Sequence, residues 1–315
     1  MILSIVIVNY KSCPFVMDCL ASLIEYFNEP SKTRIFVVDN DSKDGSVDKI
    51  RQFIKNRFCE SWVFVLPNNQ NKGFGAGNNF AVYPPLNSKE APDYFLLLNP
   101  DTVIKEGSVE ALLNFMESWP KAGIAGSRLE SSAGEPQDSV FHFHSLMGEI
   151  ILGLRTGILS KIFPQWEFSL PLPHDNQRVD WVSGACMMIR REVFQDIGLF
   201  DEKFFLYFEE EDFCLRAVKS GWECWYVPQA RVVHLVGESS GFKYKNQPWP
   251  RHWFESRRYF FLKHFGFFYT VCADLGWITG RLIYKLRRLI QFKPIEEPQR
   301  FFRDFVKNSV IFHGA

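Results

Sequence analysis

Short apolar runs alternate with helix-length amphipathic stretches over roughly the first third of the chain. The runs are rich in β-branched and aromatic residues, as buried strands are, and they are Ile2–Val8, Ile35–Val38, Trp62–Leu66 and Tyr94–Leu98. The stretches between them include Pro14–Phe27 and Gly45–Ile54. Apolar strands that alternate with helices predict an α/β fold, with a mostly parallel central sheet covered by helices on both faces.

The pattern becomes less regular after about residue 128, and it changes again near residue 246. Between these points we expect strands and helices at Val182–Ile189 (strand), Arg190–Ile197 (helix), from Glu209 onward (helix), Cys224–Val227 (strand) and Arg231–Leu235 (strand). From Asn246 the composition becomes aromatic and basic. We therefore predict one domain over residues 1–245, with halves at 1–128 and 129–245, and a helical extension over residues 246–315.

Charge and cysteine content narrow the function classes. Lys and Arg together number 36, as do Asp and Glu, so no net field draws the protein to nucleic acid and we expect no such partner. The 7 cysteines are an odd number without a C-x-x-C spacing, which argues against a disulfide framework and a zinc site.

The N-terminus has no basic segment and no small-residue cleavage site, so we expect a cytoplasmic protein.

Polar residues follow several of the predicted strands. Ligands of open parallel sheets bind beyond the carboxyl ends of the strands, and the residues at these ends are Asn9-Tyr10, Asp39-Asn40 and Asn99-Pro100-Asp101. An acidic side chain such as Asp39 can accept hydrogen bonds from a nucleobase or a ribose. A simple turn explains the segment around Asp39 about equally well, because Asp, Asn, Ser and Gly favour turns and helix caps.

The segment Asn71–Asn79 is glycine-rich and follows the third predicted strand. Its backbone can approach a phosphate closely at the N-terminus of a helix. The segment is neither a G-x-G-x-x-G fingerprint nor a Walker loop, so a structural turn is about as good an interpretation.

Asp101 is the last residue of the segment 96–101, which begins with three leucines, and it is a candidate metal ligand. Carboxylate oxygens suit Mg²⁺ or Mn²⁺, and a divalent ion neutralises charge on a diphosphate leaving group. Asn-Pro-Asp also favours a plain strand-ending turn, but the position after a buried strand favours the metal. His234 lies in a short apolar strand, where a histidine is more often a core residue than a ligand.

Four consecutive acids, Glu209–Asp212, follow a run of apolar and aromatic residues. A carboxylate held against such a wall has a raised pKa and can act as a general base. The same acids suit the first turn of a helix, with Asp212 paired to Arg216 four residues later. Both interpretations can hold for different acids of the run.

Taken in order, these segments resemble glycosyltransferase family 2, and within it the rhamnosyltransferase-like branch. The resemblance covers about residues 4–241, and it is carried by residues 4–10, 38–42, 71–78, 98–101, 181–190, 198–202, 208–216 and His234. It implies a GT-A fold and an inverting enzyme that moves a sugar from a nucleoside-diphosphate sugar to an acceptor hydroxyl, in cell-surface polysaccharide or glycolipid assembly. The branch suggests rhamnose from dTDP-rhamnose.

The resemblance also implies roles for single residues. Tyr10 would lie against the base and Asp39 would bind its imide edge. The residues that would complete the nucleotide-sugar pocket are Asn9, Asn40, Gly73, Asn78 and Asn99. The wall that faces donor sugar and acceptor would be formed by Trp181, Gly184, Ala185 and Glu209. Asp101 would hold Mn²⁺ or Mg²⁺, with His234 as a second ligand, and Glu210 would be the general base.

The sequence departs from the family pattern at two of these positions. Asn99 replaces the first acid of the D-x-D motif, which leaves the metal with one fewer charged ligand. Glu210 replaces an aspartate, so Glu209 and Asp212 remain alternative bases. A UDP-sugar donor and a degenerate nucleotide-binding module stay open as alternatives. A nucleotidyltransferase is disfavoured, because its basic glycine-rich loop should follow the first strand.

The C-terminal region suggests contact with a membrane surface and a lipid-linked acceptor. The segment Gly266–Tyr284 is long enough to span a bilayer, but Asp274 and Arg281 within it make spanning costly. Leu282, Leu286 and Leu289 have helical spacing among basic residues, which is typical of an interfacial helix. A helix that merely covers the catalytic domain explains the pattern nearly as well.

Overall fold

A computed structural model describes residues 2–27, 32–235 and 247–313, so the end of the family resemblance at 237–241 lies outside the described residues. The contacts divide the chain into two units. The sheet unit comprises residues 1–140, 171–205 and 209–243. The helical unit comprises residues 141–170, 206–208 and 244–315. Each unit has its own buried core.

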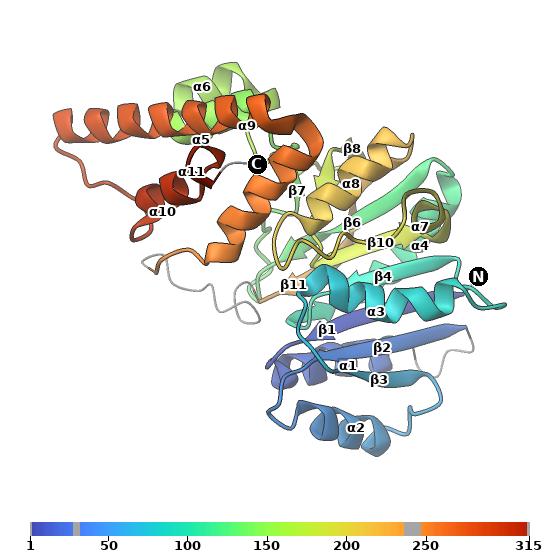
Figure 1. The fold of residues 1–315 in the computed structure, drawn as a ribbon. Coiled ribbons are helices and arrows are strands. Elements are labelled where there is room, and N and C mark those ends of the chain that lie inside the picture. Colours follow the sequence, from blue (N-terminus) through green and yellow to red (C-terminus); the bar gives the residue numbers. More distant parts are fainter. Residues whose placement is uncertain (1, 28–31, 236–246, 314–315) are drawn as a thin grey trace. The chain divides into compact units, whose positions relative to one another are not determined.

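The described strands are mostly short, and Figure 1 labels most of them. They are β1 (Leu3–Asn9), β2 (Thr33–Asn40), β3 (Val63–Asn68), β4 (Tyr94–Leu98), β5 (Thr102–Ile104), β6 (Ala122–Glu130), β7 (Val140–Phe141), β8 (Gln177–Val179), β9 (Trp181–Val182), β10 (Cys186–Arg190) and β11 (Glu223–His234).

The helices of the sheet unit are α1 (Cys13–Phe27), α2 (Ser46–Asn56), α3 (Phe74–Leu86), α4 (Ser108–Ser118), α7 (Arg191–Ile197) and α8 (Glu209–Lys219). The helical unit contains α5 (Leu146–Leu154), α6 (Gly157–Ile162), the 3-10 turn η1 (Pro164–Trp166), α9 (Arg251–Ile290), α10 (Phe301–Asn308) and α11 (Val310–His313).

The central sheet of the sheet unit runs in the order β3-β2-β1-β4-β10-β6-β11-β5, and β8 pairs with β11. The strands β1 to β4 are parallel to one another. Strand β10 is antiparallel to both β4 and β6, whereas β11 is parallel to β6. The predicted α/β fold with a mostly parallel sheet is therefore confirmed, and α9 is the long C-terminal helix.

The buried residues of the sheet unit explain why these segments form strands. Every residue of β1 and of β4 is buried, as expected for parallel strands with both faces covered. Isoleucine, valine and leucine from β1, β2 and β4 pack with Val16, Leu20 and Leu23 of α1. The residues at the carboxyl ends of these strands are thereby held in fixed positions.

Three predicted strands differ in detail from the observed ones. The segment 182–189 is divided into β9 and β10, with Ser183, Gly184 and Ala185 between them. The two short strands expected at 224–227 and 231–235 are a single strand, β11, whose register against β6 shifts between Val227 and Arg231. Such an irregularity interrupts the apolar pattern of the sequence, so one strand is predicted as two.

Close backbone contact holds α5 against α9 in the helical unit. A Cβ atom at Gly153 would lie 2.5 Å from the carbonyl oxygen of Trp277, and one at Gly280 would lie 2.9 Å from the amide nitrogen of Leu154. The helices can approach this closely only because both positions are glycine. Arg257 of α9 pairs with Glu149 at 2.7 Å and with Asp274 at 2.6 Å, and all three residues are buried.

The helix α9 contains a bend at Gly266, whose backbone angles (φ 79°, ψ 176°) are not helical. The two halves of α9 therefore run in different directions. Across the described part of the chain, no helix combines the length and the apolar character that crossing a membrane requires.

Candidate active site

The sequence-predicted site residues gather at one edge of the central sheet. Strand pairing places Asn9 opposite Asp39, and Ile7 opposite Leu98, the residue before Asn99. Leu98 in turn lies opposite Cys186, the residue after Ala185. The last residues of β1 and β2 and the residue that follows β4 therefore share this edge with the residues that precede β10, as the sequence predicted for a ligand site.

Asp39 belongs to a buried hydrogen-bond network between β1 and β2. Asn9 Nδ2 donates to Asp39 Oδ2 at 2.6 Å, and the backbone N–H of Ser42 donates to Asp39 Oδ1 at 3.0 Å. Ser42 Oγ also accepts a hydrogen bond from the Lys11 N–H at 2.9 Å. Each Asp39 oxygen already accepts one bond, and each can accept one more from a ligand. The turn and the ligand interpretations are thus compatible.

The glycine-rich segment leads into a helix, as the phosphate interpretation requires. Gly73 is the residue before α3 and has φ +98°, a conformation that L side chains rarely adopt. A Cβ atom there would lie 1.7 Å from the carbonyl oxygen of Phe205. Asn40 Nδ2 donates to the Gly73 carbonyl at 2.8 Å, so two predicted pocket residues are in direct contact.

Asn78 and Tyr10 offer groups that a ligand can use. Asn78 Nδ2 donates to the carbonyl of Phe74 at 3.0 Å, whereas the buried Asn78 Oδ1 has no hydrogen-bond partner within the part of the chain described. Tyr10 follows β1 and its side chain is 42% exposed. An exposed ring at this edge can stack against a base.

Asp101, His234 and Asn99 form a second cluster at the same edge. His234 Nε2 lies 3.5 Å from Asp101 Oδ1 and 3.4 Å from Asn99 Nδ2. Asp101 is buried, and His234 is opposite Thr102 in the β5–β11 pair. The strand pairing thus explains why residues 101 and 234, which are far apart in sequence, meet. We find no group of three or more His, Cys, Asp or Glu residues arranged as a metal site in the described ranges.

Glu210 lies against the connection between β9 and β10. A Cβ atom at Gly184 would lie 3.2 Å from Glu210 Oε1 and 3.3 Å from Cε1 of Phe74, so glycine leaves room for this carboxylate. Burial is the main reason that the pKa of Glu210 is raised above its ordinary value. Hydrogen bonds from the backbone N–H groups of Glu210 and Gly184 oppose that rise.

The neighbouring acids of α8 have different environments. Glu209 is 1% exposed, and burial, followed by repulsion from Glu210, raises its pKa well above the ordinary value. Its Oε2 has no hydrogen-bond partner among the residues described. Asp212 pairs with Arg216 at 2.9 Å, and the Arg216 guanidinium also donates to the carbonyls of Ile197 and Leu199. Asp212 therefore has the structural role that its spacing suggested.

The remaining predicted wall residues also lie in the sheet unit. Trp181 is buried in β9. The Ala185 carbonyl accepts a hydrogen bond from the Asn99 N–H at 3.0 Å, which joins the predicted wall to the residue that follows β4.

Three residues that help to build the site were not predicted as site residues from the sequence. Ser42 orders the loop after Asp39, Phe205 contacts Gly73, and Phe74 lies beside Gly184. Ser42 belongs to the motif around Asp39, so its contribution could have been recognised. The contacts of Phe205 and Phe74 join segments far apart in sequence, and no local pattern indicates them.

The sheet order and the polar strand ends define a sugar transferase of the GT-A type. The family model for glycosyl transferase family 2 matches residues 4–198, and the chain belongs to this family. It is therefore a glycosyltransferase.

Similar proteins include N-acetylglucosaminyl-diphospho-decaprenol L-rhamnosyltransferase of Mycobacterium tuberculosis, which is 30% identical over 251 residues, covering 76% of this chain and 78% of the relative. The low-salt glycan biosynthesis hexosyltransferase Agl10 of Haloferax volcanii is 28% identical over 300 residues, covering 90% of this chain and 85% of that protein.

Among solved structures, GalNAc-T7 with UDP, GalNAc and Mn²⁺ has a TM-score of 0.60 at 15% identity. The match covers 98% of this chain but only 57% of that chain. This likeness concerns the fold.

Proposed function

We propose that this enzyme transfers L-rhamnose from dTDP-rhamnose to an acceptor hydroxyl, with inversion at the anomeric carbon. The observation that carries the transfer chemistry is the environment of Glu210. Its carboxylate lies against Gly184 at the sheet edge that also holds Asp39, Asn99 and Asp101, and its pKa is raised. A raised pKa brings a carboxylate closer to the working pH of a general base.

The choice of donor follows from the base-binding residues and from the relatives. Asp39 can accept a hydrogen bond from the imide N–H of thymine, while the exposed ring of Tyr10 stacks against the base. Uracil presents the same imide edge, so a UDP-sugar is the alternative donor. The name of the similar Mycobacterium tuberculosis protein, an L-rhamnosyltransferase, supports rhamnose as the transferred sugar.

The residues at the strand end fit a divalent cation. The 3.5 Å between Asp101 Oδ1 and His234 Nε2 is near the separation of about 3 Å expected for adjacent ligands of one octahedral ion. Mg²⁺ and Mn²⁺ sites often use one or two protein ligands together with substrate phosphates and water. Asp101 and His234 would hold the ion, and Asn99 would lie beside it. When bound, such an ion neutralises negative charge on the nucleoside diphosphate.

The protein groups perform the proton transfer and the positioning. Glu210 accepts the proton of the acceptor hydroxyl, and the acceptor oxygen then forms a bond to the anomeric carbon as the bond to the diphosphate breaks. Gly184 leaves space for the Glu210 carboxylate, and the Gly184 N–H helps to orient it. A single displacement of this kind inverts the anomeric configuration.

We also propose a lipid-linked acceptor and a position on the cytoplasmic face of a membrane. The name of the mycobacterial relative, which includes a diphospho-decaprenol acceptor, supports a lipid-linked substrate. The domain boundary near residue 246 remains a prediction, and we assign the catalytic residues to the part before it.

Asp101→Asn tests the proposed metal and donor site. Asp101→Asn should weaken Mn²⁺-dependent binding of dTDP by at least about tenfold, because it removes the one charged ligand of the cluster. Calorimetric titrations with dTDP and with UDP, with and without Mn²⁺, measure this effect and compare the two bases.

Asp48→Asn is the matched control, since Asp48 is exposed on α2. Equal dTDP affinity of the Asp101→Asn variant and the wild type, or full turnover in EDTA, contradicts the assignment. Donor binding without any sugar transfer would instead support a degenerate nucleotide-binding module.

A further inference from the structure

An open cleft of about 550 Å³ in the sheet unit is lined by aromatic and amide side chains. Its aromatic part consists of Phe115 in α4, Trp119, which follows α4, and Trp225 in β11. The centre of the Trp225 ring lies 5.3 Å from that of Phe115 and 5.2 Å from that of Trp119. Trp119 is 46% exposed, although tryptophan is highly buried on average in folded proteins. The cleft therefore presents aromatic surface to solvent.

One carboxylate fixes both tryptophan rings of this cleft. Trp119 Nε1 donates to Glu223 Oε2 at 3.2 Å, and Trp225 Nε1 donates to the same oxygen at 2.9 Å. An indole has a single N–H donor, so the polar edge of each ring is already satisfied and the apolar faces remain for contact. Because the rings are oriented before any ligand binds, binding does not have to order them.

The cleft also contains exposed amide side chains, which are those of Asn114, Asn176 and Gln229. Asn176 precedes β8, in which Arg178 lies opposite Trp225. Gln229 lies where the register of β11 against β6 shifts, and an irregularity of this kind can re-aim a side chain. An amide offers both N–H donors and a carbonyl acceptor, so these side chains suit a ligand that carries hydroxyl groups.

The cleft is distant from the candidate active site within the sheet unit. Trp225 is near the start of β11, whereas His234, which lies beside Asp101, is its last residue. The separation of nine residues along β11 corresponds to roughly 25–30 Å of extended strand. A group bound in the cleft is therefore not the sugar that reacts.

We propose that this cleft binds an uncharged oligosaccharide, with a pyranose ring stacked on the exposed ring of Trp119. One face of a pyranose carries C–H groups, whose positive partial charge suits the negative face of an aromatic ring. The hydroxyl groups at the edge of the sugar both donate and accept hydrogen bonds, as the amide side chains do. The described residues that line the cleft carry no charge, which favours a neutral sugar over a nucleotide or a charged polymer.

A second carbohydrate site suits a glycosyltransferase whose acceptor belongs to a longer glycan. A glycan held in the cleft stays attached to the enzyme while its acceptor end is near the active site, which raises the effective concentration of that end. The proposal goes beyond the donor and the general base proposed above, and it depends on neither of them.

Binding of defined oligosaccharides to the full-length chain tests the proposal. The probes are chitohexaose, cellohexaose and a rhamnan oligosaccharide at millimolar concentration, measured by tryptophan fluorescence and by saturation transfer from protein to sugar protons. At least one of them should bind the wild type. Trp119→Leu keeps an apolar side chain but removes the flat ring, so the affinity should fall at least about tenfold. The double variant Asn114→Ala, Gln229→Ala should weaken binding severalfold, because it removes hydrogen-bonding groups.

Phe58→Ala is the matched control, since it removes a ring that is 84% exposed elsewhere in the sheet unit. Its affinity for the sugar should stay within about twofold of the wild type. Trp119 also packs against Trp225, so the thermal midpoint of each variant is measured as well. The two alanine substitutions are at exposed positions, and they keep the test decisive if Trp119→Leu does not fold.

Four outcomes overturn the proposal. The first is that none of the three oligosaccharides binds, and the second is that a folded Trp119→Leu variant binds them as tightly as the wild type. A loss of dTDP affinity in this variant would mean that the cleft takes a nucleotide. Self-association that Trp119→Leu abolishes, without sugar binding, would mean that the rings contact a second copy of the chain. Calorimetry with dTDP should otherwise give the same affinity for every variant, so a failed donor site is distinguished from a failed glycan site.

Discussion

Glu210 combines a raised pKa with a fixed position beside Gly184, and both properties can be measured. Glu210→Gln keeps the shape of the side chain but removes the proton acceptor, so the transfer rate should fall by about 10²–10⁴-fold. Donor affinity should stay nearly constant. In the wild type, the rate should fall as pH drops through the raised pKa of Glu210, because only the ionised carboxylate accepts a proton.

The neighbouring acids provide the comparison for this prediction. Glutamine at position 209 and asparagine at position 212 are assayed in parallel for transfer rate and dTDP affinity. If the 210 variant transfers sugar at a near wild-type rate while another variant is inactive, the base is that other carboxylate. Asp212→Asn should mainly lower stability, because Asp212 pairs with Arg216.

Glu209 is expected to reduce stability at neutral and alkaline pH. Its pKa in the folded protein is well above the ordinary carboxyl value, chiefly through burial. The contribution of such a group to stability is fully present below the pKa that it has in the unfolded chain. That contribution is lost as pH rises through the pKa that the group has in the folded protein. Glu209→Gln should therefore raise the thermal midpoint at pH 8, with a smaller gain at pH 5. Glu106→Gln, on an exposed loop, is the control, and equal midpoints for wild type and Glu209→Gln at pH 8 would contradict the prediction.

At the residue scale, the sequence predicted which side chains lie at the strand ends but not how they contact one another. The motifs identified Asp39, Asn40 and Gly73, and the structure joins Asn40 to Gly73 by a hydrogen bond. Contacts made across the fold, such as Phe205 with Gly73, have no local signal. They depend on where α8 and its preceding loop pack, which periodicity does not determine.

At the scale of elements, apolar patterning located the four parallel strands well and the later segments less well. The observed β4 has the predicted bounds, and β1 to β3 differ by a few residues. Strand β6 was not predicted, because its sequence is rich in glycine and alanine. Gly126 faces Val182 so closely that a Cβ atom would lie 2.5 Å from it, so packing rather than propensity selects this strand.

A buried carboxylate links three of these later elements. Glu130, at the end of β6, pairs with Arg231 of β11 at 2.7 Å and with Lys105, which follows β5, at 2.6 Å. These partners lower the pKa of Glu130 to about 2. Its contribution to stability is present above the unfolded carboxyl pKa and is lost as pH falls through about 2.

Glu130→Gln should lower the free energy of unfolding at pH 7 by roughly 2–3 kcal/mol. Urea denaturation measures the change, and Glu135→Gln, at an exposed position nearby, should change it by less than about 0.5 kcal/mol. An unchanged unfolding free energy for Glu130→Gln would show that the ion pairs only offset the cost of burying the carboxylate.

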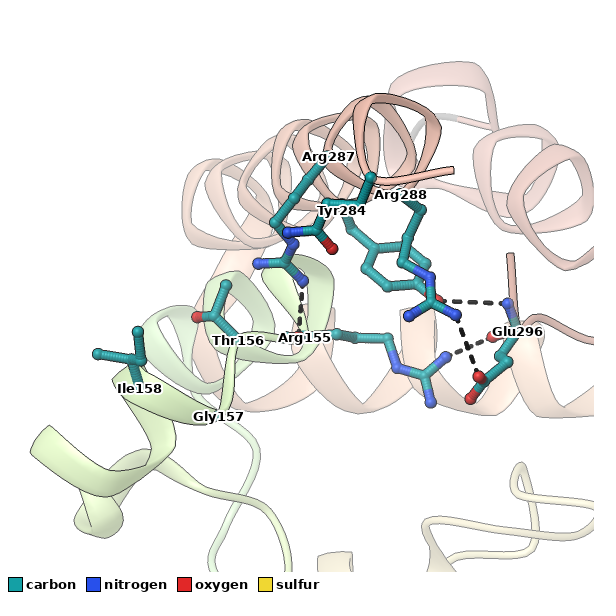
Figure 2. A pocket seen from close by; sticks show the side chains of 9 residues that line it. Arg155, Thr156, Gly157, Ile158, Tyr284, Arg287, Arg288 and Glu296 are labelled. Atoms are coloured by element: carbon teal, nitrogen blue, oxygen red, sulfur yellow. Dashed lines mark hydrogen bonds and ion pairs between the residues drawn. The ribbon is translucent and has the colours of Figure 1, made fainter. Parts of the chain in front are cut away.

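At the scale of the whole molecule, the numbers of acidic and basic residues are equal, but the local charge differs from one region to another. Lys and Arg number 36, as do Asp and Glu, so no long-range field distinguishes the protein. The acids with raised pKa values lie in the sheet unit, whereas Arg155, Arg287 and Arg288 line a cleft in the helical unit (Figure 2). Composition alone therefore could not reveal either feature, because their charges cancel in the sum.

The helical unit is built mainly from two long segments that are distant in sequence, residues 141–170 and 244–315, and this arrangement leads to a final prediction. Residues 141–170 belong with the C-terminal helices, and Glu149 of α5 is buried against Arg257 of α9. In a chain that ends at residue 245, α5 would lose this partner and the close backbone contact at Gly153. A buried carboxylate without its partner is costly, so α5 should unfold locally.

Hydrogen exchange of the shortened chain, compared with the full-length protein, tests this expectation. Amides of α5 should exchange at least about 100-fold faster in the shortened chain, whereas amides of β1 and β4 should keep their protection, because their partners lie in the sheet unit. Retained protection of α5 would mean that residues 146–154 hold their fold without α9. Loss of protection throughout β1 and β4 would instead mean that the two units unfold together.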